Sequence, residues 1–115
     1  MLFKSNGKIL LCSEYLVLEG AKAIALPSRL TQDLQVSKCQ NKIIEWQSFD
    51  ENNDLWFEEK FYFSGSDLKY DSKKNRTSEK ILILFKYLLK TKGVNDILGN
   101  KFLTKLNFKR EWGLG

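Results

Sequence analysis

The chain has 115 residues with a formal net charge of +5, two cysteines and no histidine. Its length fits one domain that is large enough for a real core. The 43% hydrophobic and 13% aromatic content argues against disorder. No apolar run approaches the roughly 20 residues that span a membrane. The sequence therefore predicts one globular domain, or part of one, over residues 1–115.

The absence of histidine excludes several chemistries. These are Ser-His-Asp catalysis, Cys-His catalysis and zinc sites of the Cys/His type.

The N-terminal residues MLFKSNGK contain no apolar segment followed by a small-residue cleavage site, so no secretory signal is evident. We therefore expect a cytoplasmic protein with no membrane partner. Cys12 and Cys39 are isolated from each other, and such cysteines most often act as small buried hydrophobic residues. Neither cysteine is a candidate site residue, and no metal site is predicted.

The first predicted element lies in the run GKILLCSEYLVLEGAKAIALP at residues 7–27, where we expect a strand over 7–13. Alternating apolar and polar residues predict a second strand over 30–38. Two further strand-like segments, 42–49 and 55–63, flank the polar cluster DENND and are expected to form a hairpin.

The spacing of apolar residues then changes to that of an amphipathic helix over 78–92, with Thr77 or Ser78 as the N-cap. A last strand is expected over 101–108. Strands followed by a helix and a returning strand predict an α+β domain. Its sheet should be mostly antiparallel, with the helix packed on one face.

The positive charge is concentrated in residues 69–92, which hold 8 basic and 2 acidic side chains. Such a segment could attract an anion, either nucleic acid or a phosphorylated small molecule. The alternative is a solvated loop and helix face that binds nothing.

The run at residues 7–27 resembles the first motif of the GHMP kinases. In that family the motif reads Pro-Gly-Lys, a few apolar residues, Gly-Glu-His or Gly-Glu-Tyr, and then an apolar stretch ending in Gly-Ala. The positions that match are Gly7-Lys8, Glu14-Tyr15 and Gly20-Ala21. The Tyr after Glu and the continuation VLEGA are most similar to the mevalonate and phosphomevalonate kinase branch.

The C-terminal Gly113-Leu114-Gly115 resembles the family's glycine-rich second motif, Pro-x-x-x-Gly-Leu-Gly-Ser-Ser. The resemblance therefore covers essentially the whole chain. It implies the N-terminal, ATP-binding part of a GHMP kinase, ending inside the second motif. The implied topology is the left-handed βαβ arrangement that this family shares with a ribosomal protein domain.

The implied activity is transfer of the γ-phosphate of ATP to a hydroxyl or phosphate of a small molecule, with mevalonate or phosphomevalonate as the leading candidates. The resemblance gives Lys8 a catalytic role at the transferring phosphate, and it places Glu14 and Tyr15 at the acceptor. The backbone of Gly113, Leu114 and Gly115 would approach the ATP phosphates.

Each of these positions also has a purely structural alternative. Lys8 could be an ordinary strand-edge lysine, Tyr15 a core residue, Glu14 a turn cap, and the glycine-rich segment a plain turn. Mg²⁺ ligands and the catalytic Asp are expected beyond Gly115, so the 115-residue chain alone should be inactive. A homodimer is left open.

The alternative function is a small basic module that binds nucleic acid through residues 69–92. The sequence has neither a basic strand interleaved with aromatic residues nor a recognition-helix motif, so nucleic acid is the less favoured partner.

Overall fold

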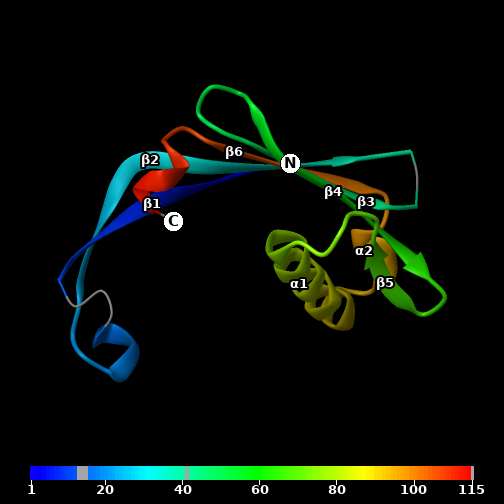
Figure 1. The fold of residues 1–115 in the computed structure, drawn as a ribbon, viewed down its shortest axis with the longest axis horizontal. Helices are drawn as coiled ribbons and strands as arrows, with labels where there is room; N and C mark the ends of the chain where they lie inside the picture. Colours follow the sequence, from blue (N-terminus) through cyan, green and yellow to red (C-terminus); the bar gives the residue numbers. More distant parts are fainter. Residues whose placement is uncertain (13–15, 41, 115) are drawn as a thin grey trace.

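The computed structural model describes residues 1–12, 16–40 and 42–114 as an α+β fold, in which a curled six-stranded sheet carries α1 and α2 on one face (Figure 1). The strands are β1 (Leu2–Cys12), β2 (Ile24–Lys38), β3 (Ile44–Phe49), β4 (Leu55–Ser64), β5 (Asp67–Tyr70) and β6 (Asn100–Leu106). The helices are α1 (Arg76–Lys92) and α2 (Val94–Ile97), with 3₁₀ helices at Leu16–Glu19 and Arg110–Trp112.

The strand order is β1-β2-β6-β3-β4-β5. Only β3 and β6 are parallel neighbours among the described strands, and the other four neighbouring pairs are antiparallel. The chain leaves β3, passes through β4, β5 and α1, and returns as β6 between β2 and β3. The mostly antiparallel sheet with a helix on one face is therefore confirmed. Its identification as the GHMP kinase N-terminal domain stays a prediction.

The core lies between α1 and the central strands. Phe85 of α1 is 1% exposed, and its ring centroid lies 5.4 Å from that of Phe61, 5.9 Å from that of Trp46 and 5.2 Å from that of Phe102. These three partners belong to β4, β3 and β6. Because aromatic side chains bury large apolar areas, this cluster fixes α1 onto the sheet.

Helix α1 begins earlier than the sequence predicted. Its N-cap is Asn75, whose Oδ1 accepts a hydrogen bond from the Thr77 backbone N–H at 2.8 Å. The expectation that Thr77 or Ser78 caps the helix was wrong, because asparagine is at least as good an N-cap and Asn75 lies two residues before Thr77. Ser78 instead lies inside the helix and is fully buried.

The outer strands are longer than predicted, and β5 was missed. Strand β1 begins at Leu2 rather than at residue 7, and β2 begins at Ile24 rather than at residue 30. Pro27 pairs with Lys8 inside the β1–β2 ladder, next to a register shift. A proline usually marks the end of a strand, and this one is accommodated at an irregularity near the sheet edge. Strand β5 has only four residues, too few for a recognisable alternation.

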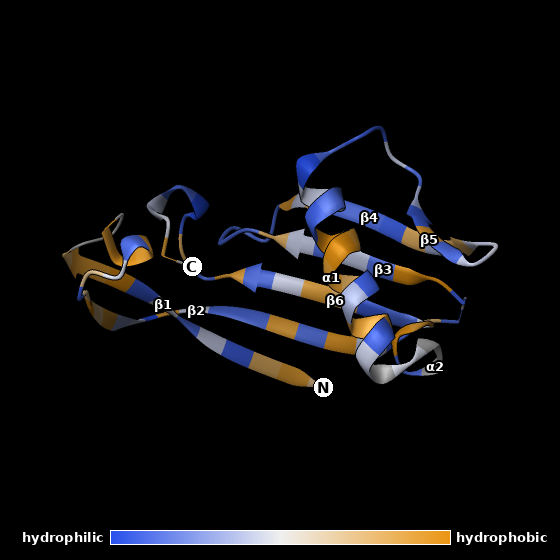
Figure 2. Ribbon diagram, turned by 90° about the horizontal axis from the view of Figure 1, so that it is seen from below, coloured by the Kyte–Doolittle hydropathy of each residue, from blue (hydrophilic) through white to orange (hydrophobic). Residues whose placement is uncertain are grey.

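The far ends of β1 and β2, with the 3₁₀ helix Leu16–Glu19, form an arm that extends beyond the part of the sheet under α1 (Figure 1). We call this region the β1–β2 arm. Figure 2 shows that it is coloured as hydrophobic along much of its length. Its exposed apolar residues are Ile9, Leu11, Leu16, Val17, Leu18, Ile24 and Leu26. No helix in the described part of the chain is long and apolar enough to cross a membrane.

Candidate functional site

Strand β1 and the segment after β6 meet at Lys8 and Leu114. The backbone N–H of Lys8 donates a hydrogen bond to the carbonyl of Leu114 at 2.7 Å. The two segments enclose a pocket of about 250 Å³. Its lining residues are Lys8, Ile9, Leu10, Trp112, Gly113 and Leu114. The structure therefore brings the lysine of the first motif-like run next to the glycine-rich C-terminal segment, and we call this space the Lys8 pocket.

Gly7 is the residue that lets these segments approach each other. A Cβ atom at Gly7 would lie 2.9 Å from Ser28 Oγ and 3.0 Å from the Cβ of Leu114. Such distances are too short for carbon contacts, so any larger residue would push Leu114 away. The β1–β2 register also shifts between Asn6 and Lys8. An irregularity of this kind bends the strand and changes the direction in which its side chains point.

The side chain of Lys8 is exposed and makes no hydrogen bond or ion pair with another described residue. By contrast, Lys4 on the same strand pairs with Asp33 at 3.5 Å. An ammonium without a carboxylate partner keeps its full attraction for an anion. Lys8 is therefore the cation of this pocket that is available to a ligand.

The glycine-rich segment forms a turn whose donors are partly used. Gly113 adopts a left-handed conformation with φ 61° after the 3₁₀ helix Arg110–Trp112, and its N–H donates to the Arg110 carbonyl at 3.3 Å. The N–H of Leu114 makes no hydrogen bond to another described residue. Within the described residues, the N–H of Leu114 is therefore unused, whereas that of Gly113 is bonded inside the turn.

Three of the predicted site residues, Glu14, Tyr15 and Gly115, lie outside the described residues. Their predicted roles at the acceptor and at the phosphates stay predictions. The structure brings Lys8 together with Gly113 and Leu114, which are the predicted residues that it does describe.

Two contacts anchor the segment that leads from β6 to Gly113. Asn107 and Thr31 are joined by backbone and side-chain hydrogen bonds, including Thr31 N–H to Asn107 Oδ1 at 2.7 Å. Further along, the guanidinium carbon of Arg110 lies 4.4 Å from the centroid of the Trp56 ring. The first contact holds the segment to β2, and the second holds it to β4.

A buried carboxylate was missed at the sequence level. Glu59 is 6% exposed and accepts hydrogen bonds from Ser72 Oγ and from Ser78 Oγ, the latter at 2.7 Å. It follows Phe57 and precedes Phe61 on the same face of β4. Its place on the apolar face was the signal that could have revealed it. This carboxylate connects β4 to the start of α1 and to the loop before it.

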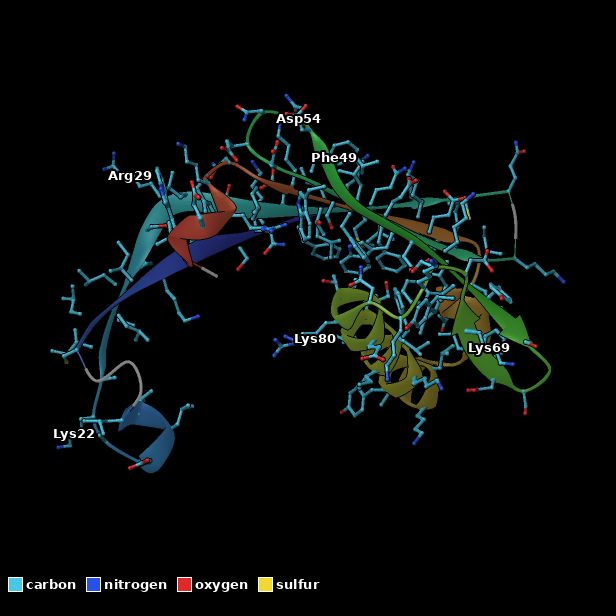
Figure 3. All side chains as sticks on the ribbon, in the orientation of Figure 1. Lys22, Arg29, Phe49, Asp54, Lys69 and Lys80 are labelled. Atoms are coloured by element: carbon cyan, nitrogen blue, oxygen red, sulfur yellow. The ribbon has the colours of Figure 1, made fainter. Side chains whose placement is uncertain are left out.

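The basic residues of the segment 69–92 come from β5, from α1 and from the loop between them. Lys69 on β5 and Lys80 on α1 lie on different sides of the helix (Figure 3). Lys86 pairs with Asp67 at 2.8 Å, and Lys74 pairs with Glu79 at 3.5 Å. Part of this charge is thus neutralised within the protein.

Metal-ligating residues are not clustered in the described part of the chain, which contains no group of three or more Cys, Asp or Glu arranged to hold a metal ion. Cys12 is exposed, and Cys39 Sγ lies 3.6 Å from the Ile43 carbonyl. The expectation of two buried cysteines is therefore wrong for Cys12, which lies at the end of β1 in the uncovered arm.

The fold and the pocket define an α+β protein in which a lysine on one sheet strand faces a glycine-rich turn from the other end of the chain. Comparison of the sequence with known protein families and with curated proteins found no match.

Proposed function

We propose that this chain is the N-terminal part of a GHMP-type kinase that transfers the γ-phosphate of ATP to a hydroxyl or phosphate of a small molecule. The observation that carries the proposal is the contact between Lys8 and Leu114. It joins the two segments whose sequences resemble the family's first and second motifs. The two segments were matched to the family separately, so their meeting in one pocket is independent support for the proposed family.

The residues of the Lys8 pocket fit an anion. The unpaired Lys8 ammonium supplies positive charge, and the Leu114 N–H supplies a backbone donor. Negative charge on the phosphoryl oxygens has to be stabilised during transfer, and positioned cations and backbone donors do this. In the proposed reaction Lys8 stabilises that charge, and the turn around Gly113 positions the phosphates.

ATP with Mg²⁺ is the cofactor that the resemblance implies. When bound, Mg²⁺ would neutralise part of the charge of the phosphates. The described residues supply no carboxylate cluster for Mg²⁺. The proposal therefore assigns the described residues to phosphate binding only. Mevalonate or phosphomevalonate remains the proposed acceptor.

The exposed apolar surfaces agree with a chain that packs against further protein. Beyond the β1–β2 arm, α1 exposes Ile83, Leu84 and Tyr87 on the side that does not face the sheet core. Large exposed apolar patches on soluble domains usually mark interfaces.

An NMR titration of this chain with Mg-ATP tests the proposal. We expect the backbone amides of Lys8, Gly113 and Leu114 to shift together, with weak affinity because one cation and few donors hold the triphosphate. Lys8→Met should abolish these shifts. Lys4→Met is the matched control, since Lys4 lies on the same strand but is paired with Asp33.

Two outcomes would reject the proposal. One is the absence of shifts around the Lys8 pocket at millimolar Mg-ATP, and the other is an equal loss in both lysine variants. A steep salt dependence of RNA or DNA binding, with sub-micromolar affinity, would favour the nucleic-acid module instead. In an active protein, where residues beyond Gly115 would also hold the nucleotide, Lys8→Met should lower kcat about a hundredfold or more and should lower ATP affinity far less.

A further inference from the structure

The turn that forms one wall of the Lys8 pocket is held by few contacts. Residues 109–112 form a 3₁₀ turn whose backbone hydrogen bonds, Trp112 N–H to Lys109 O and Gly113 N–H to Arg110 O, are internal to the turn. Within the described part of the chain, the Arg110–Trp56 stack is the one hydrogen bond, ion pair or ring contact between these side chains and another element. Apart from the Asn107–Thr31 bonds before the turn and the Lys8–Leu114 bond after it, this stack is therefore the contact that holds the turn in place.

Trp56 is a rigid partner for Arg110. It precedes Phe57, which is buried in the sheet, and Trp56 itself is 38% exposed. The β3–β4 hairpin that carries it is closed by Asp50, whose Oδ1 accepts from the Asn52 and Asp54 N–H groups at 2.9 Å. Lys105 of β6 also bonds to Asn53 at the tip of the hairpin. Hydrogen bonds within the turn thus close the hairpin, and a further bond ties its tip to β6.

The guanidinium of Arg110 contacts the Trp56 ring and does not pair with a described carboxylate. Asp50, Glu51 and Glu111 line the same surface depression, but Arg110 makes no ion pair with a described residue. A guanidinium at 4.4 Å from an aromatic centroid lies within the range of a cation–π interaction. Arginine also stacks flat on aromatic faces, which restricts its orientation as well as its distance.

We propose that Trp56 and Arg110 are positioning residues, which hold the 109–112 turn so that Leu114 reaches Gly7 and Lys8. The β3–β4 hairpin thereby determines the geometry of a pocket to which its own side chains contribute nothing. The importance of this geometry for phosphate binding rests on the proposed function. The positioning of the turn by the Arg110–Trp56 contact does not, and it can be tested without nucleotide.

The Lys8 amide reports on the position of the turn, because its N–H is bonded to the Leu114 carbonyl. The test is to measure the hydrogen exchange of this amide by NMR in the 115-residue chain without nucleotide. Removing the stack with Trp56→Ala or Arg110→Gln should speed exchange at Lys8 roughly two- to fivefold, the range expected for losing an exposed cation–π contact. Trp56→Phe keeps an aromatic ring for the guanidinium, so it should restore most of the protection. Arg110→Lys keeps the charge but not the flat stacking, so it should restore only part of it.

Exchange at Phe61 in the core monitors global stability, and Tyr87→Ala, which removes an exposed ring from α1, is the matched control. The proposal predicts faster exchange at Lys8 with no change at Phe61, and no change at either site in Tyr87→Ala. It is overturned if Arg110→Gln leaves Lys8 exchange unchanged. It is also overturned if exchange at Lys8 and at Phe61 accelerates equally, or if Trp56→Phe exchanges as fast at Lys8 as Trp56→Ala does. If the exchange results are as expected but Mg-ATP causes no shifts, the proposed kinase function is rejected and the positioning role of Trp56 and Arg110 is not.

Discussion

The central strands β3, β4 and β6 lie beneath α1, whereas the β1–β2 arm extends past it. Figure 3 shows side chains crowded between α1 and the sheet, while those of the arm project into open space. Phe61 in the covered part is 0% exposed, and Leu18 at the tip of the arm is 86% exposed. Both regions are rich in apolar residues. Burial is therefore decided by whether a second layer faces the strand, and not by the composition of the strand.

This difference should appear most strongly in stability. Phe85→Ala removes the ring that joins α1 to three strands, and we expect it to lower the free energy of unfolding by about 3–5 kcal/mol, as for other buried phenylalanines. Leu18→Ala in the arm should change it by less than about 0.5 kcal/mol. Urea denaturation followed by circular dichroism measures both. Similar losses in the two variants would show that the arm is also part of the packed core.

The next largest effect should come from the buried carboxylate of the covered region. Glu59→Ala leaves the buried hydroxyl of Ser78 without its acceptor and removes the bond from the exposed Ser72, and we expect a loss of about 1.5–3 kcal/mol. Glu58→Ala is the matched control, because Glu58 is its exposed neighbour and bonds only to Gln47 at 3.3 Å. Its effect on urea denaturation should be much smaller. Equal effects would mean that the hydroxyl contacts contribute little.

A smaller, local effect is expected where the arm meets the glycine-rich segment. Gly7→Ala places a methyl group against Ser28 and Leu114, and overpacking of this kind costs about 1–3 kcal/mol in a closed core. Here the segment with Leu114 can move away, so we expect about 1 kcal/mol or less together with faster hydrogen exchange of the Lys8 amide. Ser5→Ala on the same strand should change neither quantity. Unchanged Lys8 exchange in Gly7→Ala would contradict the close approach.

The smallest effect should come from the surface ion pair between β5 and α1. The hydrogen bond from Lys86 is the main cause that lowers the pKa of the Asp67 carboxyl below its usual value. A lowered folded-state pKa means that the pair stabilises the fold above the unfolded-state pKa, and that this contribution disappears as the pH falls through the folded-state pKa.

Lys86→Gln should therefore raise the Asp67 pKa toward its ordinary value, as measured by NMR titration of the carboxyl carbon. Because both groups are well exposed, the change in overall stability should be close to the limit of detection. A titration that is the same in both proteins would show that the pair is not formed in solution.

Local patterns in the sequence were enough to predict most elements. The spacing of Ile81, Phe85 and Leu88 identified α1, and the alternation in 55–63 identified β4, because helices and strands repeat over a few neighbouring residues. Boundaries were less predictable. Gly7 and Pro27 interrupt the local pattern, although both lie inside paired strands.

The sequence by itself determined the α+β class, the position of the main helix and the two motif-like runs at either end of the chain. Only the tertiary structure decided that Lys8 meets Leu114, that Glu59 is buried and that Trp56 holds Arg110. These contacts join residues far apart in sequence. Their formation depends on strand order and on where β6 enters the sheet, which no local repeat of apolar residues can specify.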